Sequence, residues 1–136
     1  MTVVLDSGFV VALARGRDAR HHAARAWIDT YDEDLVTSPL AVAEMDYIIG
    51  KHQGERGQQA LRANLVSGVY LVRWWADAIV EAVEIARHHP WIGLTDASLV
   101  ALAGRLRTNR ILTFDDHFRS LTTPGGEPFV VLPADA

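Results

Sequence analysis

The chain contains no cysteine among its 136 residues. This absence excludes disulfides, thiolate zinc sites and cysteine nucleophiles. No apolar run approaches the ~20 residues that a membrane-spanning helix needs. The opening residues, MTVVLD, also lack the basic segment and the cleavage site of a signal peptide. We therefore expect a cytoplasmic protein that does not enter a membrane.

Several motifs of common enzyme classes are absent as well. The sequence has no G-x-G-x-x-G, no P-loop and no G-x-S-x-G, so dinucleotide binding, P-loop chemistry and a serine-hydrolase elbow have no support. Acidic residues outnumber basic ones, 17 to 13, which gives a net charge of −4, and Lys51 is the only lysine. That balance disfavours a passive nucleic-acid binder. It still permits an enzyme whose carboxylates hold cations, because a bound metal reverses the local charge.

The order of segments predicts an α/β fold. The chain is 49% hydrophobic and 22% charged, as in ordinary globular proteins, and its length suits one domain over residues 1–136. Short apolar segments alternate with helical ones, which favours a mostly parallel central sheet with helices on both faces. The predicted strands cover residues 2–5, 35–37, 69–72, 111–114 and 129–132.

Acidic residues follow two of these strands. Asp6 comes directly after the continuous apolar run of residues 2–5, which suits a strand buried on both faces. Asp115 and Asp116 follow residues 111–114. Open α/β sheets bind ligands beyond the carboxyl ends of their strands. Taken singly, however, Asp6 is equally explained as a helix cap, and Asp115 or Asp116 as a turn residue.

Two further acids lie on predicted helices. Ser38 and Pro39 indicate the start of a helix that runs to about residue 51, and Glu44 falls inside its apolar stripe. We expect Glu44 to point inward and to have a partner, since a buried unpaired carboxylate is costly. Asp96 follows Thr95, the expected cap of a helix that runs to about residue 107, and shares a face with its apolar residues.

Asp6, Glu44, Asp96 and Asp115 can all reach one edge of the predicted sheet. Carboxylates this close together repel, and a divalent cation removes the conflict. An all-oxygen site without cysteine selects Mg²⁺ or Mn²⁺ over zinc. The chemistry most often built on such a site is phosphodiester hydrolysis.

The sequence resembles the PIN-domain nucleases and, within them, the toxins of VapBC-type toxin–antitoxin pairs. The resemblance covers residues 2 to about 118. It rests on the order and spacing of five segments, which are residues 4–7 (VLDS), 18–24 (DARHHAA), 38–44 (SPLAVAE), 94–99 (LTDASL) and 111–118 (ILTFDDHF). The resemblance implies a PIN-like fold and a Mg²⁺-dependent endoribonuclease, for which Mn²⁺ can substitute. It also implies a homodimer that acts on RNA and is inhibited by a small VapB-type antitoxin protein.

Carried over by position, the resemblance assigns the metal site. Asp6, Glu44 and Asp96 match the most constant acids of the family, and Asp115 matches the fourth. Asp6 and Asp96 are expected to contact the metal most directly, and the other two acids to complete its shell. Ser7 and Thr113 match hydroxyl positions that bond carboxylates or the metal's water. Asp116 has no clear counterpart, and it either helps to hold a second metal or is solvated.

Other polar and aromatic residues give weaker signals. The six histidines form no ligand set, and His117 is expected at the surface beside the acidic edge. The Trp74-Trp75 pair suits base stacking or, more simply, packing. The arginines placed near the cleft mouth, where they would meet phosphates, are Arg15, Arg17, Arg73 and Arg119.

Four more helices complete the expected fold. Two are expected over residues 7–14 and 56–66. Asp18 is expected to cap a third over residues 19–31, and the fourth, over residues 76–88, is expected to turn Ile79, Val80, Val83 and Ala86 inward. Two other functions remain open. One is a PIN-like module that binds RNA or a protein partner without cutting. The other, more distant, is a phosphotransfer domain, although Gly8 stands where its second acid is expected.

Overall fold

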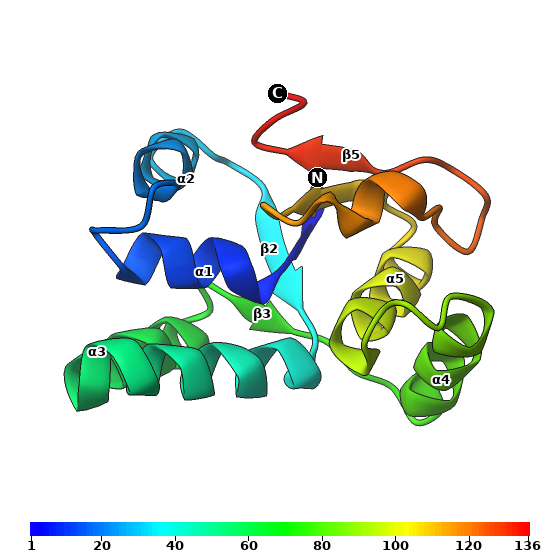
Figure 1. Ribbon diagram of the computed structural model, residues 1–136, viewed down its shortest axis with the longest axis horizontal. Helices are drawn as coiled ribbons and strands as arrows, with labels where there is room; N and C mark the ends of the chain where they lie inside the picture. Colours follow the sequence, from blue (N-terminus) through cyan, green and yellow to red (C-terminus); the bar gives the residue numbers. More distant parts are fainter.

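A computed structural model describes residues 1–136 and has a five-stranded parallel sheet at its centre (Figure 1). The strand order is β3-β2-β1-β4-β5, and every neighbouring pair is parallel. The strands are β1 (Thr2–Leu5), β2 (Asp34–Thr37), β3 (Leu71–Val72), β4 (Arg110–Leu112) and β5 (Val130–Leu132). The predicted α/β class with a parallel sheet is therefore confirmed.

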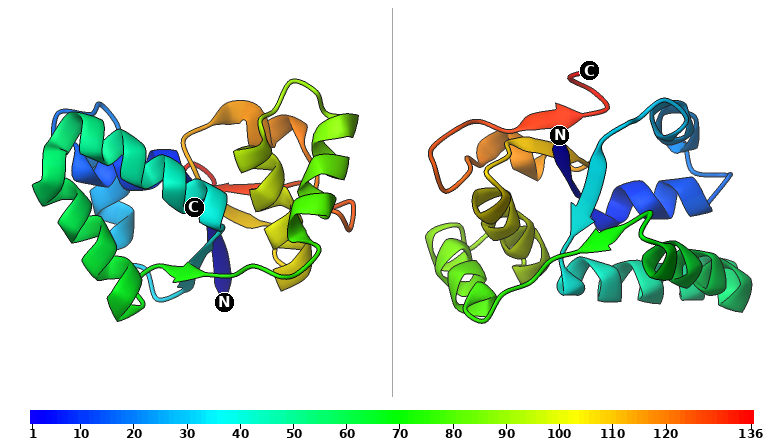
Figure 2. Two further views of the ribbon diagram at one scale, coloured as in Figure 1. Left: turned by 90° about the horizontal axis from the view of Figure 1, so that it is seen from below. Right: turned by 180° about the vertical axis from the view of Figure 1, so that it is seen from behind.

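The helices divide between the two faces of this sheet (Figures 1 and 2). Helices α1, α2 and α3 cover one face, and α4, α5 and the short 3₁₀ helix η1 lie on the other. None of the helices is both long enough and apolar enough to cross a bilayer. The bounds are α1 (Ser7–Ala14), α2 (His21–Ile28), α3 (Pro39–Ser67), α4 (Ala78–His88), α5 (Leu94–Leu106) and η1 (Asp116–Ser120).

The sheet has its topological switch point between β1 and β4. From β1 the chain moves outward through β2 to β3, and then returns to add β4 and β5 on the opposite side of β1. Right-handed crossovers place the two groups of helices on opposite faces, which leaves a crevice beyond the carboxyl ends of β1 and β4. Asp6 directly follows β1, and Thr113 directly follows β4.

Strand β1 is the centre of the hydrophobic core. Val3, Val4 and Leu5 are fully buried, as the uninterrupted apolar run predicts. Val4 pairs with Val36 on one side and Ile111 on the other. A rigid, buried strand of this kind fixes the position of the residue that follows it, which is Asp6.

The first helices differ from expectation in extent. Asp18 does not cap α2; its carboxylate accepts the backbone N–H of Arg20 in a turn, and the helix begins only at His21. The segment α3 consists of two helices joined across a kink at Gly54, so the helices expected up to about residue 51 and over residues 56–66 are both present. Gly54 has a left-handed φ of 67°, which suits a residue without a side chain. Helix α5 begins one residue before Thr95, and its N-cap is Gly93.

Helix α4 packs Ala86 against the core as expected, but it leaves three of its branched apolar residues exposed to solvent. Ile79, Val80 and Val83 were expected inward, but they are 43%, 64% and 41% exposed. The buried residues of this helix are instead Ala78 and Ala82. Small alanines let α4 pack closely, so Ile79, Val80 and Val83 are left on the outer surface.

Candidate metal centre

An open cleft of about 570 Å³ lies beyond the carboxyl ends of β1 and β4. Every acid that the sequence singled out lines it. They come from four places in the chain: the residue after β1, the second turn of α3, the first turn of α5, and the two adjacent residues at which η1 begins. The five carboxylates are those of Asp6, Glu44, Asp96, Asp115 and Asp116.

Asp6 is the buried residue of this group, with 5% of its surface exposed. Its Oδ1 accepts the backbone N–H of Ser7 at 2.8 Å, and its Oδ2 accepts the hydroxyl of Thr113 at 2.6 Å. Burial, helped by the charges of Asp96 and Asp115, raises the pKa of Asp6 to about 6 despite these hydrogen bonds. The carboxylate form is therefore costly unless a cation is near.

Thr113 connects Asp6 to the loop after β4. Its hydroxyl oxygen also accepts the backbone N–H of Asp115 at 2.9 Å. Asp115 in turn caps η1, because its Oδ1 accepts the N–H of His117 at 2.9 Å. One buried threonine thus fixes two of the acids relative to each other.

Glu44 does not point into the core as expected. The buried stripe of α3 is Ala41, Met45 and Ile49, and Glu44 lies on its flank, exposed to the cleft. A residue one position before the centre of a stripe is rotated by ~100° from it, which is enough to reach the edge of the buried face. The expected partner exists, because the Ser7 hydroxyl donates to Oε1 of Glu44.

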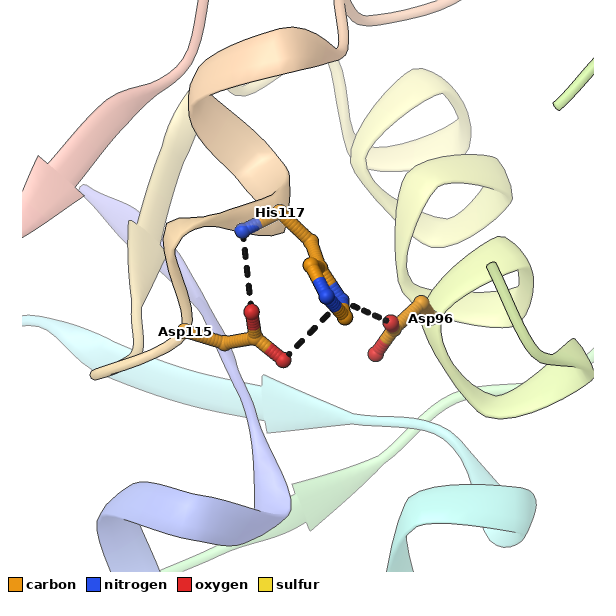
Figure 3. A group of neighbouring side chains, drawn as sticks. All are labelled: Asp96, Asp115 and His117. Atoms are coloured by element: carbon orange, nitrogen blue, oxygen red, sulfur yellow. Dashed lines mark hydrogen bonds and ion pairs between the residues drawn. The ribbon is translucent and has the colours of Figure 1, made fainter. Parts of the chain in front are cut away.

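Asp96, Asp115 and His117 converge on one point (Figure 3). Nδ1 of His117 lies 3.3 Å from Oδ2 of Asp96 and 3.2 Å from Oδ2 of Asp115. The hydrogen bond to Asp96 and the charges of the acids raise the pKa of His117. Burial raises the pKa of Asp96. The three residues offer ligand atoms within 4.8 Å of one another, so His117 belongs to a possible ligand group that the sequence did not indicate.

The structure places the basic residues differently from expectation. None of Arg15, Arg17, Arg73 and Arg119 lines the acidic cleft, and Arg119 forms a two-bond ion pair with Asp135 at 2.7 Å. The arginine that lines the cleft is Arg20, which sequence reasoning missed. Arg20 lies within residues 18–24, one of the segments that carry the family resemblance, but the resemblance assigned it no role, and the turn that Asp18 forms with it was not predicted.

Comparison with known families identifies the fold. The family model described as PIN domain matches residues 3–123, which include all five cleft acids. The chain belongs to the PIN-domain family. Its sheet order and its acidic crevice at the switch point are therefore those of a PIN domain, as the resemblance implied.

Relatives of this PIN domain are VapC proteins. Ribonuclease VapC26 of Mycobacterium tuberculosis is 34% identical over 135 residues, covering 96% of this chain and all of the relative. Ribonuclease VapC29 of the same organism is 28% identical, with 98% of each chain covered. A crystal structure of M. tuberculosis VapC20, described as a sarcin-ricin loop cleaving toxin, superposes with a TM-score of 0.81 at 25% identity. It covers 87% of this chain and 93% of its own.

The residues present in this PIN domain fit a divalent metal. The donor set is oxygen-rich, as a hard divalent cation prefers. Burial and the neighbouring acids raise the pKa of Asp6, because they disfavour its negative charge, and a bound cation offsets that cost. Five carboxylates face only one arginine and one histidine across the cleft. This cluster can therefore bind a divalent cation at the ends of β1 and β4.

Proposed function

We propose that this PIN domain is a metal-dependent endoribonuclease and the toxin of a type II toxin–antitoxin pair. The observation that carries the proposal is the convergence of four motif acids, Asp6, Glu44, Asp96 and Asp115, on one cleft. The similarity to ribonuclease VapC26 over nearly the whole chain supports it. In this proposal residues 1–136 act as one cytoplasmic nuclease domain.

The metal is Mg²⁺, and Mn²⁺ substitutes for it. A hard cation of this kind supplies an activated water and stabilises charge on the phosphate oxygens during phosphodiester hydrolysis. Asp6 and Asp96 hold it most directly, with Glu44 and Asp115 completing the ligand set. Asp116, exposed at the start of η1, either contributes to a second ion or is solvated.

The surrounding side chains orient these acids. Ser7 donates to Glu44 and Thr113 donates to Asp6, so each hydroxyl fixes the direction in which a carboxylate faces. Groups that orient metal ligands typically change metal affinity or activity ~10–100-fold when they are removed. His117 lies between Asp96 and Asp115, and its hydrogen bond to Asp96 together with the charges of the nearby acids raises the pKa of its imidazole.

Expression in a bacterial host tests the proposed toxin activity. The wild-type protein should arrest growth and produce discrete new RNA ends, whereas Asp96→Asn should accumulate without either effect. Growth arrest without new RNA ends would contradict the ribonuclease. It would favour the alternative, a PIN-like module that binds RNA or a partner without cutting.

The proposed antitoxin is a small VapB-type protein. The VapC relatives and the motif resemblance support this partner. Co-expression with the product of the adjoining gene should restore growth and yield a complex that co-purifies. If growth stays arrested although both proteins accumulate, that product is not the antitoxin.

A homodimer is the proposed assembly, and the outer face of α4 is the proposed contact with a second copy. Ile79, Val80 and Val83 leave three branched apolar side chains exposed on one helix. Val80→Asp should convert the dimer to a monomer in light scattering without unfolding it. Val66→Asp is a matched control, because Val66 is 90% exposed on α3. A wild-type monomer at high concentration would contradict the dimer.

A further inference from the structure

Arg20 is the arginine of the acidic cleft, and two contacts hold it there. Its guanidinium carbon lies 5.2 Å from the centre of the Phe114 ring, and Phe114 itself lines the cleft. Its Nε lies 3.3 Å from a carboxylate oxygen of Asp18. The side chain nevertheless stays 52% exposed, so its remaining N–H donors face solvent. It directly precedes α2 in the chain.

Trp91 lies in the loop between α4 and α5, which are on the opposite face of the sheet from α1 and α2 (Figure 2). It does not line the acidic cleft itself but contacts His117, which does. It is the exposed member of the four tryptophans, with 50% of its surface accessible. Its ring meets the His117 ring edge to face, with centroids 5.5 Å apart and planes at 81°. His117 contacts Asp96 and Asp115, so one imidazole separates the indole from the acids.

We propose that Arg20 and Trp91 are the RNA-positioning residues of this cleft. Arg20 contacts a phosphate next to the scissile one, and Trp91 stacks on an unpaired base on the opposite side of the acids. The assignment rests on the proposed ribonuclease function. It goes further because it gives the path of the RNA strand across the metal site. The RNA runs from Arg20 and Phe114, past the acids, to Trp91.

Charge and shape support the two roles separately. A polyanion that enters a cleft with five carboxylates needs a cation beside the metal, and a guanidinium offers forked donors that match phosphate oxygens. Its stacking on Phe114 keeps it extended toward the cleft. A half-exposed indole contributes little to the core, but it offers an aromatic face on which any base can stack.

The test measures binding of two probes in a cleavage-deficient Asp6→Asn background with Mg²⁺. One probe is a labelled single-stranded RNA of random sequence, and the other is an abasic ribose-phosphate chain of equal length. Trp91→Ala should weaken binding of the RNA about 5- to 100-fold and leave the abasic chain unaffected. Arg20→Ala should weaken binding of both probes and lower the slope of log affinity against log salt by about 0.7.

Matched variants separate positioning from folding. Tyr47→Ala removes another exposed aromatic residue, and Arg25→Ala removes an arginine of α2 that lies outside the acidic cleft. Both should bind like the parent. Trp91→Phe should retain most of the affinity, and Arg20→Lys should retain the salt slope. In the active protein, Trp91→Ala should raise KM more than it lowers kcat.

The outcomes distinguish a failure of this assignment from a failure of the proposed ribonuclease function. If the wild-type protein cleaves RNA while Arg20→Ala and Trp91→Ala bind like the controls, the assignment is wrong and the ribonuclease stands. Equal loss of RNA and abasic binding in Trp91→Ala would also contradict base stacking. If the wild-type protein neither cleaves nor binds RNA, the proposed function falls and the assignment falls with it.

Discussion

The hydroxyl of Thr113 donates a 2.6 Å hydrogen bond to Oδ2 of Asp6, across 107 positions of sequence. Both side chains are buried, at 1% and 5% exposure, at the carboxyl ends of the adjacent strands β4 and β1. The bond fixes a carboxylate at the point where the order of the sheet reverses. The rest of the acidic cleft is arranged around that carboxylate.

Replacing Thr113 with valine should therefore weaken both the fold and the metal site. The substitution leaves a buried carboxyl oxygen without its donor, which costs about 1–3 kcal/mol of unfolding free energy. It also removes the acceptor of the Asp115 N–H. Urea unfolding and Mg²⁺ calorimetry measure the two effects, with Thr113→Ser as the control that keeps the hydroxyl. Metal affinity equal to that of the wild type in the valine variant would contradict the role of this bond.

Ser7→Ala should reduce RNA cleavage with little loss of stability. Its hydroxyl orients the exposed Glu44, so its removal frees that carboxylate without opening the core. We expect activity to fall about 10- to 100-fold, as for other residues that orient metal ligands. Initial rates at saturating Mg²⁺ measure this, and Ser7→Thr should restore part of the loss. An unchanged rate in the alanine variant would show that Glu44 needs no fixed orientation.

The metal-free protein should lose stability as pH rises toward neutrality. Burial raises the pKa of Asp6 from 3.8 to about 6, so the folded state favours the protonated form. The resulting stabilisation is complete below about pH 3.8 and is lost as pH rises through about 6, with an upper limit of about 3 kcal/mol. Unfolding in EDTA from pH 4 to 7 measures this loss. Asp6→Asn should flatten the profile, and Mg²⁺ should restore stability at pH 7. A profile that Asp6→Asn leaves unchanged would exclude Asp6 as its source.

Mg²⁺ binding should lower the pKa of His117. The hydrogen bond to Asp96 and the surrounding carboxylate charges hold this pKa above its usual value, and a bound cation offsets those charges. NMR titration of the imidazole with and without Mg²⁺ measures the change, and the exposed His52 on α3 provides a reference resonance. If the His117 titration is the same in both conditions, the metal does not bind between Asp96 and Asp115.

The α/β fold and the acids of the cleft were predictable from the sequence, because they depend on local patterns. The apolar run of β1 specifies a strand buried on both faces, and parallel strands align their carboxyl ends. Asp6 and Asp115, which follow two such strands, could thus be placed at one edge from the sequence, and helical patterns added Glu44 and Asp96. Family resemblance then assigned these four acids to a metal site and added Ser7 and Thr113 as hydroxyl positions.

The parts that were missed depend on packing. Glu44 was expected in the core because helical periodicity cannot separate the flank of a stripe from its centre. Val80 was expected inward because the alanines that let α4 pack closely give a weak hydrophobic signal. Arg20 and Trp91 lie in turns, whose path through space is set by tertiary contacts with Phe114 and His117.

The most direct test of the central claim is cleavage of total RNA by the purified, antitoxin-free protein with Mg²⁺, Mn²⁺ or EDTA, beside Asp96→Asn. We predict discrete products with either metal, none with EDTA, and none from the variant at equal folded concentration. Products that persist in EDTA or in Asp96→Asn would contradict a nuclease that works through these carboxylates.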